Sequence, residues 1–221
     1  MLRKLVKYIQ EKSLKPLLMW YLRKDRTYKF EGITLVVFKD IFHPLFFYST
    51  MILIRHLKKF DLRNKSLLEP GCGSGLISVW AAKKGALVTA FDINPVAVEN
   101  TLINAEKNKV VVQTLVSDLF INLPEFKYDF ILINPPYYRG KPLNGSQYAW
   151  YCGNDYEYFE NLFKKLPDYS KLNNETIMVL SQDCDLQMIQ TIALRNNLNM
   201  QLISSIRSLL EKNYLYKISC R

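Results

Sequence analysis

A glycine-rich turn at residues 69–75 constrains the fold of this chain more than any other feature. Its sequence is Glu-Pro-Gly-Cys-Gly-Ser-Gly, and it joins a short apolar run at 67–69 to a helical pattern at 75–84 that ends before Gly85. Glycine at alternate positions lets the backbone turn tightly and approach a ligand with no Cβ in the way. The free amides at the start of the helix then face that ligand. The turn therefore predicts a nucleotide-type ligand at the end of a β-strand.

Strand and helix patterns alternate from this turn to the end of the chain. We expect strands at 67–69, 87–91, 110–116, 130–134, 176–180, 200–206 and 214–219, and helices at 75–84, 95–108, 155–166 and 185–196. The early strands are largely apolar and show no regular alternation with polar residues, which is typical of strands that are buried on both faces. The pattern predicts an α/β fold, a doubly wound, Rossmann-like sheet of seven mostly parallel strands.

The first 45 residues differ from the rest in charge. Residues 1–30 carry nine Lys or Arg side chains against two acids, in a chain with a formal net charge of +10. We expect a helix at 2–24, a short strand at 33–38 and a helix from Pro44 to about residue 58. The chain is thus divided into a basic, helical N-terminal extension (1–45) and a main domain (46–221). The basic arm either attracts a polyanion, such as RNA, the ribosome or an anionic membrane face, or is a solvated amphipathic helix.

Composition argues against several classes of protein. No stretch approaches the roughly 18 uninterrupted apolar residues that cross a bilayer. The N-terminus lacks the apolar core and cleavage site of a secretory signal. The four cysteines have no Cys-x-x-Cys spacing, and the two histidines have no metal-ligand pattern around them. We expect a cytoplasmic protein with no membrane span, no disulfide framework and no metal.

A second motif, Asn134-Pro135-Pro136-Tyr137, ends the strand expected at 130–134. The Asn134 side chain and the Pro135 carbonyl can accept both N–H bonds of a planar nitrogen and favour positive charge that develops on it. Prolines hold such a turn rigid, and the ring of Tyr137 can stack on a planar group. Taken alone, the motif is equally consistent with a turn that merely ends a strand, because Asn and Pro are common in turns.

Acidic residues follow two further strands. Asp92 ends the strand at 87–91, where a carboxylate can accept hydrogen bonds from both hydroxyls of a ribose. Asp118 follows the strand at 110–116. Each acid also has a plainer interpretation, Asp92 as the cap of the next helix and Asp118 as a turn residue. The glycine spacing disfavours NAD, because the third glycine of G-x-G-x-x-G comes one residue early and Leu76 fills the last position.

Together these segments resemble two motifs of the class I S-adenosylmethionine (SAM)-dependent methyltransferases. Residues 69–75 resemble the family's E/D-x-G-x-G-x-G loop. Residues 128–137 are similar to the strand and NPPY motif of amino-methyltransferases, which include the HemK-type release-factor glutamine methyltransferases and certain RNA and DNA base methylases. The resemblance covers about residues 32–182. The Arg-Pro-x-Thr-Glu segment of the bacterial enzymes is not present, and Tyr48-Ser49-Thr50 falls at that place.

The resemblance implies roles for the residues of both motifs. The catalytic residues that it implies are Asn134, Pro135 and Tyr137. The cofactor-binding residues that it implies are Glu69, Gly71, Cys72, Gly73, Gly75, Asp92, Ile93, Asp118, Leu119, Asn134 and Thr50. Among these, Asp92 would bind the ribose, Asp118 would face the adenine amine, and Leu119 would contact the adenine ring.

The implied function is methyl transfer from SAM to a planar amide or exocyclic amine. The lead acceptor is a glutamine of a protein such as a translation factor, and the alternative is an adenine or guanine amine in RNA, which the basic arm favours. A non-catalytic SAM-binding regulator would have no need of Asn134 and Tyr137. Aromatic residues of the long connection 138–154 and its flanks either stack on the substrate or pack the loop onto the sheet. They are Tyr137, Tyr138, Tyr148, Trp150, Tyr151 and Tyr156.

Overall fold

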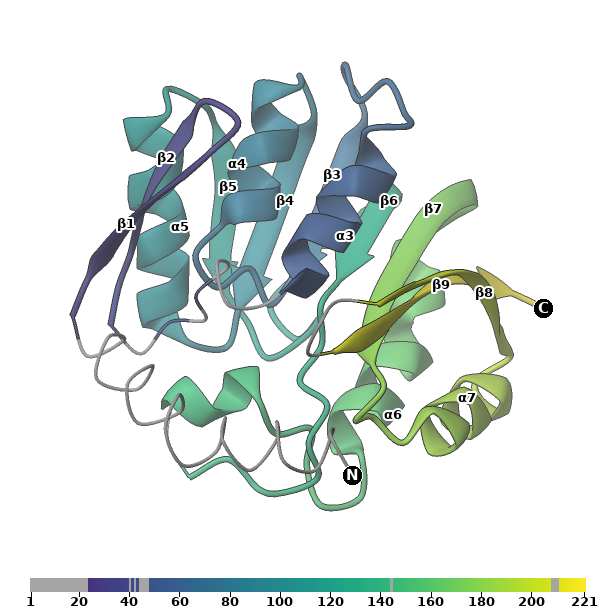
Figure 1. The fold of residues 1–221 in the computed structure, drawn as a ribbon. Coiled ribbons are helices and arrows are strands. Elements are labelled where there is room, and N and C mark those ends of the chain that lie inside the picture. The colour runs from purple at the N-terminus through teal and green to yellow at the C-terminus, as the bar shows by residue number, and fades with distance from the viewer. Residues whose placement is uncertain (1–23, 40, 42, 44–47, 144, 208–210) are drawn as a thin grey trace.

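The computed structural model describes residues 24–221, apart from 40, 42, 44–47, 144 and 208–210. These residues form a seven-stranded sheet with the order β5-β4-β3-β6-β7-β9-β8 (Figure 1). The strands are β3 (Ser66–Pro70), β4 (Leu87–Asp92), β5 (Val112–Val116), β6 (Tyr128–Ile133), β7 (Ser170–Ser181), β8 (Leu198–Arg207) and β9 (Lys212–Cys220). Strands β3 to β7 are parallel, whereas β9 pairs antiparallel with β7 and β8. The predicted class, a mostly parallel seven-stranded α/β sheet, is confirmed.

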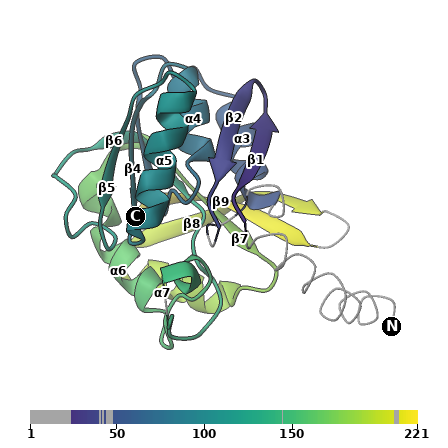
Figure 2. The ribbon, with the colours of Figure 1, turned by 90° about the vertical axis from the view of Figure 1, so that its left-hand side faces the viewer.

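Helices cover both faces of this sheet (Figures 1 and 2). One face carries α3 (Tyr48–Leu57), α4 (Leu76–Lys83) and α5 (Pro95–Lys107), and the other carries α6 (Glu157–Lys165) and α7 (Leu186–Arg195). Neighbouring strand residues point to opposite sides, so Leu67 belongs to the core under α3–α5 and Leu68 to the core under α6 and α7. Burial on both faces explains why the central strands β3 and β6 are largely apolar and do not alternate.

The predicted elements differ from the observed ones mainly at their ends. Strand β7 begins at Ser170, six residues before the predicted start, because a polar stretch continues the strand. The helix predicted at 155–166 begins at Glu157 and runs into the short 3-10 helix η3 (Leu166–Tyr169). The helix predicted at 2–24 and the predicted start of α3 at 44–47 lie outside the described residues.

A β-hairpin precedes the sheet. Its strands, β1 (Arg26–Phe30) and β2 (Ile33–Val37), pair antiparallel, and the hairpin lies against the outer side of α4 and α5 (Figure 2). Strand β2 is predicted from the sequence, whereas β1 is not, although the alternation Arg-Thr-Tyr-Lys-Phe is a strand signal.

Asparagines one turn apart on α5 hold β2 in place. The Asn104 side chain accepts a hydrogen bond from the Val36 N–H (2.8 Å) and donates one to the Val36 carbonyl (2.7 Å). Asn108 makes the same pair of bonds with Thr34 (3.1 and 2.9 Å). Because residues four apart share one helix face, the two side chains meet successive free groups along the strand edge. Hydrogen bonds therefore attach β2 to the main domain across the division predicted at residue 45.

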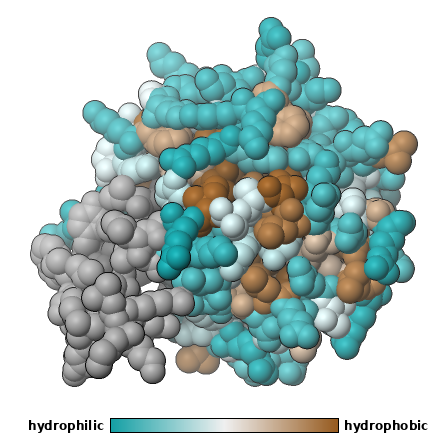
Figure 3. All heavy atoms as spheres, turned by 45° about the vertical axis from the view of Figure 1, so that its right-hand side comes forward, coloured by the Kyte–Doolittle hydropathy of each residue, from teal (hydrophilic) through white to brown (hydrophobic). Residues whose placement is uncertain are grey.

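Strand β8 forms one edge of the sheet. Figure 3 brings the β7–β9 side of the molecule forward and shows apolar residues in separate groups among hydrophilic ones. On β8, Leu202 and Ile203 are exposed, and the pairing with β9 shifts register between Leu202 and Ser204. Such a bulge interrupts the ladder and makes an edge a poorer template for another strand.

Candidate active site

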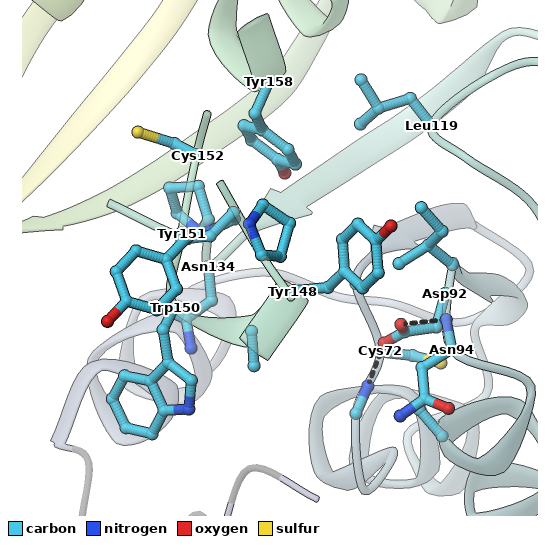
Figure 4. A pocket seen from close by; sticks show the side chains of 18 of the residues that line it. Cys72, Asp92, Asn94, Leu119, Asn134, Tyr148, Trp150, Tyr151, Cys152 and Tyr158 are labelled. Carbon is cyan, nitrogen blue, oxygen red and sulfur yellow. Dashed lines mark hydrogen bonds between the residues drawn. The ribbon is translucent and has the colours of Figure 1, made fainter. Parts of the chain in front are cut away.

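A cavity of about 530 Å³ lies at the carboxyl ends of β3, β4 and β6. The predicted site residues that line it are Thr50, Glu69, Gly71, Cys72, Gly73, Asp92, Ile93, Asp118, Leu119, Asn134, Pro135 and Tyr137. The glycine-rich turn and the Asn-Pro-Pro-Tyr corner therefore share one cleft, because β3 lies between β4 and β6 in the sheet. Figure 4 shows Asn134, Trp150 and Tyr151 on one side of this cavity, and Cys72, Asp92 and Asn94 on the other.

The glycine-rich turn is bound to the end of β4. The N–H groups of Gly71 and Cys72 both donate to the Phe91 carbonyl (2.8 and 3.0 Å). Gly71 has a φ of +70°, and a Cβ added there would meet no atom within 4 Å. The turn thus leaves open space directly over its backbone, as a closely bound ligand requires.

Gly75 is the predicted site residue that does not line the cavity. It has a φ of +75° and caps α4, and an added Cβ would lie 2.8 Å from two side-chain atoms of Thr101. The structure therefore gives Gly75 a packing role, the close approach of α4 and α5. Gly71 and Gly75 therefore serve different purposes, although they share one motif: Gly71 leaves space for a ligand, and Gly75 allows close packing of two helices.

Asp92 faces the cavity and holds the turn in place. Its Oδ2 accepts from the Gly73 N–H (3.0 Å) and its Oδ1 from the Asn94 N–H (2.9 Å). Burial raises the pKa of Asp92, although these hydrogen bonds oppose the rise. The cap of α5 is Asn94, which accepts from the Val96 N–H at 3.0 Å, so the interpretation of Asp92 as the helix cap is wrong.

The other acids of the cofactor side differ in their surroundings. The buried Glu69 carboxyl accepts from the backbone N–H (2.9 Å) and the hydroxyl of Ser78, and burial raises its pKa to about 8. Glu69 is thus mostly a neutral acid at pH 7. Asp118 also lines the cavity, and its side chain has no hydrogen bond with any other residue that the structure describes. Its carboxylate is available to a ligand.

Cys72 lies in the same wall but is not a reactive thiol. Its Sγ accepts a hydrogen bond from the Thr101 hydroxyl at 3.3 Å. Burial raises the pKa of this thiol, so it stays protonated at neutral pH. The cysteine therefore shapes the turn and offers no nucleophile.

Asn134 and Tyr137 form the opposite side of the cavity. The Asn134 side chain is half-buried and makes no hydrogen bond within the described part of the chain, so its amide is free to bind a substrate. The Tyr137 ring lies against the Tyr138 ring, with 4.9 Å between centroids. Burial raises the pKa of Tyr137, which keeps the hydroxyl protonated. This corner presents amide and carbonyl oxygens beside an aromatic ring, as a planar nitrogen requires.

Main-chain hydrogen bonds close the loop 138–154 at its base. The Tyr138 N–H donates to the Trp150 carbonyl (2.9 Å), and the Cys152 N–H donates to the Tyr138 carbonyl (2.9 Å). Gly140 and Gly153 exchange N–H···O bonds of 3.1 Å in both directions. The loop includes the 3-10 helix η2 (Gly145–Ala149), and it forms one wall of the cavity.

The aromatic residues around this loop divide into two groups. Tyr137, Tyr148, Trp150 and Tyr151 line the cavity, whereas Tyr138 and Tyr156 do not. The Tyr156 hydroxyl donates to Asp185 at 3.1 Å and packs the start of α6. Packing of the loop region is thus confirmed for Tyr156, whereas stacking of Tyr137, Tyr148, Trp150 and Tyr151 on a substrate stays a prediction.

Several residues of the loop and of α6 line the cavity without being predicted from the sequence. They include Lys141, Glu157, Tyr158 and Asn161. No motif marks these positions, because Lys141 reaches the cavity through the course of the loop, and Glu157, Tyr158 and Asn161 reach it through the packing of α6. Among the residues that the structure describes, no group of three His, Cys, Asp or Glu side chains could hold a metal ion. In the same residues, no helix has the length and apolar character needed to cross a membrane.

The doubly wound sheet is the fold of the class I methyltransferases, and residues 46–149 match the family model of the methyltransferase small domain. A putative protein N5-glutamine methyltransferase of Methanocaldococcus jannaschii is 43% identical over 108 residues, which are 48% of this chain and 52% of that protein. The chain thus spans about half the length of this relative. The resemblance noted in the sequence is confirmed.

Two solved structures share the fold. A methyltransferase of Pyrococcus furiosus superposes with a TM-score of 0.64 at 19% identity, over 96% of this chain and 100% of the other. A Thermus thermophilus 16S rRNA N2 G1207 methyltransferase, in complex with AdoMet and guanosine, superposes with a TM-score of 0.60 at 17% identity, over 88% of this chain and 50% of the other. At these identities the likeness shows the fold alone.

Proposed function

We propose that this protein is a SAM-dependent N-methyltransferase whose acceptor is the side-chain amide of a protein glutamine. The observation that carries the proposal is the single cavity lined by the glycine-rich turn and by Asn134 and Pro135. The name of the archaeal relative, a glutamine methyltransferase, supports the choice of acceptor. The basic N-terminal arm as a contact for RNA or the ribosome stays a prediction, as does a cytoplasmic location.

The residues on the β4 side of the cavity suit SAM. Asp92 carries carboxylate oxygens that accept hydrogen bonds from ribose hydroxyls. Asp118 is available for the adenine amine, and Leu119 lies beside it for an apolar contact with the ring. The open space over Gly71 takes a ligand against the backbone. When bound, SAM supplies a methyl group activated by its sulfonium charge.

Asn134 and Pro135 perform the positioning that an amide acceptor needs. An amide nitrogen is a poor nucleophile because its lone pair is delocalised into the carbonyl. The Asn134 Oδ1 and the Pro135 carbonyl accept the two N–H bonds, which orient the nitrogen and stabilise positive charge on it. Tyr137 packs on the planar group. Proximity and orientation alone can supply roughly 7–11 kcal/mol of a barrier.

An RNA amine is the second candidate acceptor. The solved rRNA methyltransferase has the same fold, and the chain is basic overall. Nucleic-acid sites usually bind phosphates with Lys and Arg. Among the described residues that line the cavity, however, Lys141 is the single Lys or Arg. This lining offers little to bind flanking phosphates and therefore favours a neutral amide as the acceptor.

Transfer of label from tritiated SAM tests the proposal. The full chain is incubated with a translation release factor and, separately, with undermethylated ribosomal and transfer RNA. We expect label in the protein, recovered as N5-methylglutamine after complete proteolysis. If RNase treatment removes the label, the acceptor is an RNA amine and not a protein glutamine. If calorimetry shows no binding of SAM, the assignment as a methyltransferase fails altogether.

A further inference from the structure

Tyr158 is a cavity residue to which neither motif gives a role. It belongs to the first turn of α6 and lines the cavity together with Asp92, Asp118 and Leu119. In Figure 4 its ring projects into the cavity with the hydroxyl toward the interior, on the side of Leu119. This hydroxyl has no hydrogen bond with any other described residue, whereas the hydroxyl of Tyr156, two residues earlier, is bound to Asp185.

The position of Tyr158 is fixed from two directions. Its backbone N–H donates to the Cys152 carbonyl (3.1 Å), at the closed base of the loop that forms the acceptor wall. Its ring packs edge-on against the buried Phe159, with 5.4 Å between centroids. The side chain is therefore held in place before any ligand binds, which lowers the entropy cost of using it in binding.

The electrostatic surroundings of the hydroxyl favour its role as a donor. Burial raises the pKa of Tyr158, and the charges of Asp92 and Asp118 raise it further. The phenol thus keeps its proton near two carboxylates that can only accept hydrogen bonds. Adenosine offers donors, the ribose hydroxyls and the adenine amine, and also acceptors, the ring nitrogens and the ribose oxygens. The two carboxylates match the donors, and a protonated phenol matches an acceptor.

We propose that Tyr158 is a cofactor-binding residue whose hydroxyl donates a hydrogen bond to the adenosine half of SAM. The proposal rests on the proposed function, because it takes SAM as the ligand of the cavity. It assigns to α6 a direct contact with the cofactor, in addition to those of the strand ends. Since Tyr158 is bonded to Cys152, the same segment shapes the cofactor side and the acceptor wall.

The test removes only the hydroxyl. In Tyr158→Phe we expect the Kd for SAM and for S-adenosylhomocysteine, measured by calorimetry, to rise about 3- to 10-fold, as for loss of one hydrogen bond. Both ligands contain the adenosine half and should weaken alike. The KM for SAM should rise by a similar factor, while the acceptor KM and kcat at saturating SAM stay unchanged.

Tyr156→Phe is the matched control, because it removes a hydroxyl from the same helix end outside the cavity. We expect its Kd for SAM to stay within about twofold of the wild type, and its unfolding midpoint to fall through loss of the bond to Asp185. Tyr158→Phe should leave the midpoint of the ligand-free protein unchanged. Wild-type affinity in Tyr158→Phe, or weaker binding matched by a lower midpoint, would overturn the proposal. Failure of the wild-type chain to bind SAM would instead overturn the proposed function.

Discussion

The two ends of the parallel sheet treat their carboxylates in opposite ways. At the amino end, Asp129 accepts hydrogen bonds from the Lys171 ammonium (2.8 Å) and from both the N–H (2.9 Å) and the hydroxyl (2.7 Å) of Ser66. At the carboxyl end, Asp92 and Asp118 take part in none of the ion pairs found among the described residues. Asp129 at the amino end is thus paired with a cation, whereas Asp92 and Asp118 at the carboxyl end have no cation as partner among the described residues.

The pKa values express the same difference. Burial tends to raise the pKa of Asp129, but the hydrogen bonds from Lys171 and Ser66 outweigh it and lower the pKa to about 2. Burial raises the pKa of Glu69 to about 8, and its bonds to Ser78 only reduce that rise. A strongly perturbed pKa in a cleft marks a candidate functional site, although structural ion pairs also perturb pKa values. We therefore propose that the amino end of the sheet stabilises the fold and that the carboxyl end, which lines the cavity, carries the chemistry.

The largest effect should come from Asn134→Ala. We expect methyl transfer to fall by about 10²-fold, as for loss of a hydrogen bond made in the transition state, while the Kd for SAM stays near the wild-type value. Single-turnover rates with tritiated SAM measure the first quantity and calorimetry the second. Asn196→Ala, at the end of α7, is the control and should transfer normally. A methyl-transfer rate in Asn134→Ala equal to that of the wild type would show that Asn134 does not position the acceptor nitrogen.

Alanine substitutions at two glycines of the same turn should have different effects, one on the stability of the fold and the other on the binding of SAM. Gly75→Ala places a Cβ 2.8 Å from Thr101 at a positive φ, so we expect the free energy of unfolding to fall by about 2–3 kcal/mol. Gly71→Ala meets no atom within 4 Å, so only the strain of positive φ remains, about 1 kcal/mol. Its Cβ should instead weaken SAM binding, which calorimetry of the folded variant measures. Equal losses of stability in urea denaturation would contradict this division.

Alanine substitutions of one aspartate at each end of the sheet compare the roles of the two ends. Asp129→Ala leaves the Ser66 N–H and the Lys171 ammonium without their acceptor, so we expect a loss of about 1–2 kcal/mol in unfolding free energy and no change in the Kd for SAM. Asp92→Ala should raise that Kd at least about 10-fold, and it also leaves the Gly73 and Asn94 N–H groups without their acceptor, so some stability is lost as well. If Asp129→Ala weakened SAM binding as much as Asp92→Ala, the two ends would not be functionally distinct.

The sequence predicted the parts of the site that local chemistry determines. The glycine-rich turn and the Asn-Pro-Pro-Tyr corner are contiguous motifs, and alternating strands and helices place both at the same sheet edge. Tyr158 could not be found in this way, because it reaches the cavity through the packing of α6 against the loop 138–154. The bonds of Asn104 to Val36 join residues 68 apart, and no local pattern distinguishes them from those of a surface asparagine.

The smallest predicted effect concerns the pH dependence of stability. Asp129, at the amino end of the sheet, should affect stability at low pH, and Glu69, at the carboxyl end, should affect it at higher pH. The folded-state pKa of Asp129, about 2, lies below its ordinary value of 3.8, so its stabilisation is present above about pH 4 and lost as the pH falls toward 2. Glu69 is reversed. Its folded-state pKa of about 8 lies above 4.5, so its stabilisation is present below about pH 4.5 and lost as the pH rises through 8.

Urea midpoints measured across pH on the ligand-free protein separate these contributions. Asp129→Asn should flatten the decline between pH 4 and 2, by about 1 kcal/mol after screening by solvent, and leave the alkaline side unchanged. Glu69→Gln should flatten the decline between pH 4.5 and 8 and leave the acid side unchanged, because an amide neither gains nor loses a proton there. If the decline between pH 4.5 and 8 were as steep in Glu69→Gln as in the wild type, Glu69 would not be its source, and the raised pKa assigned to Glu69 would be wrong.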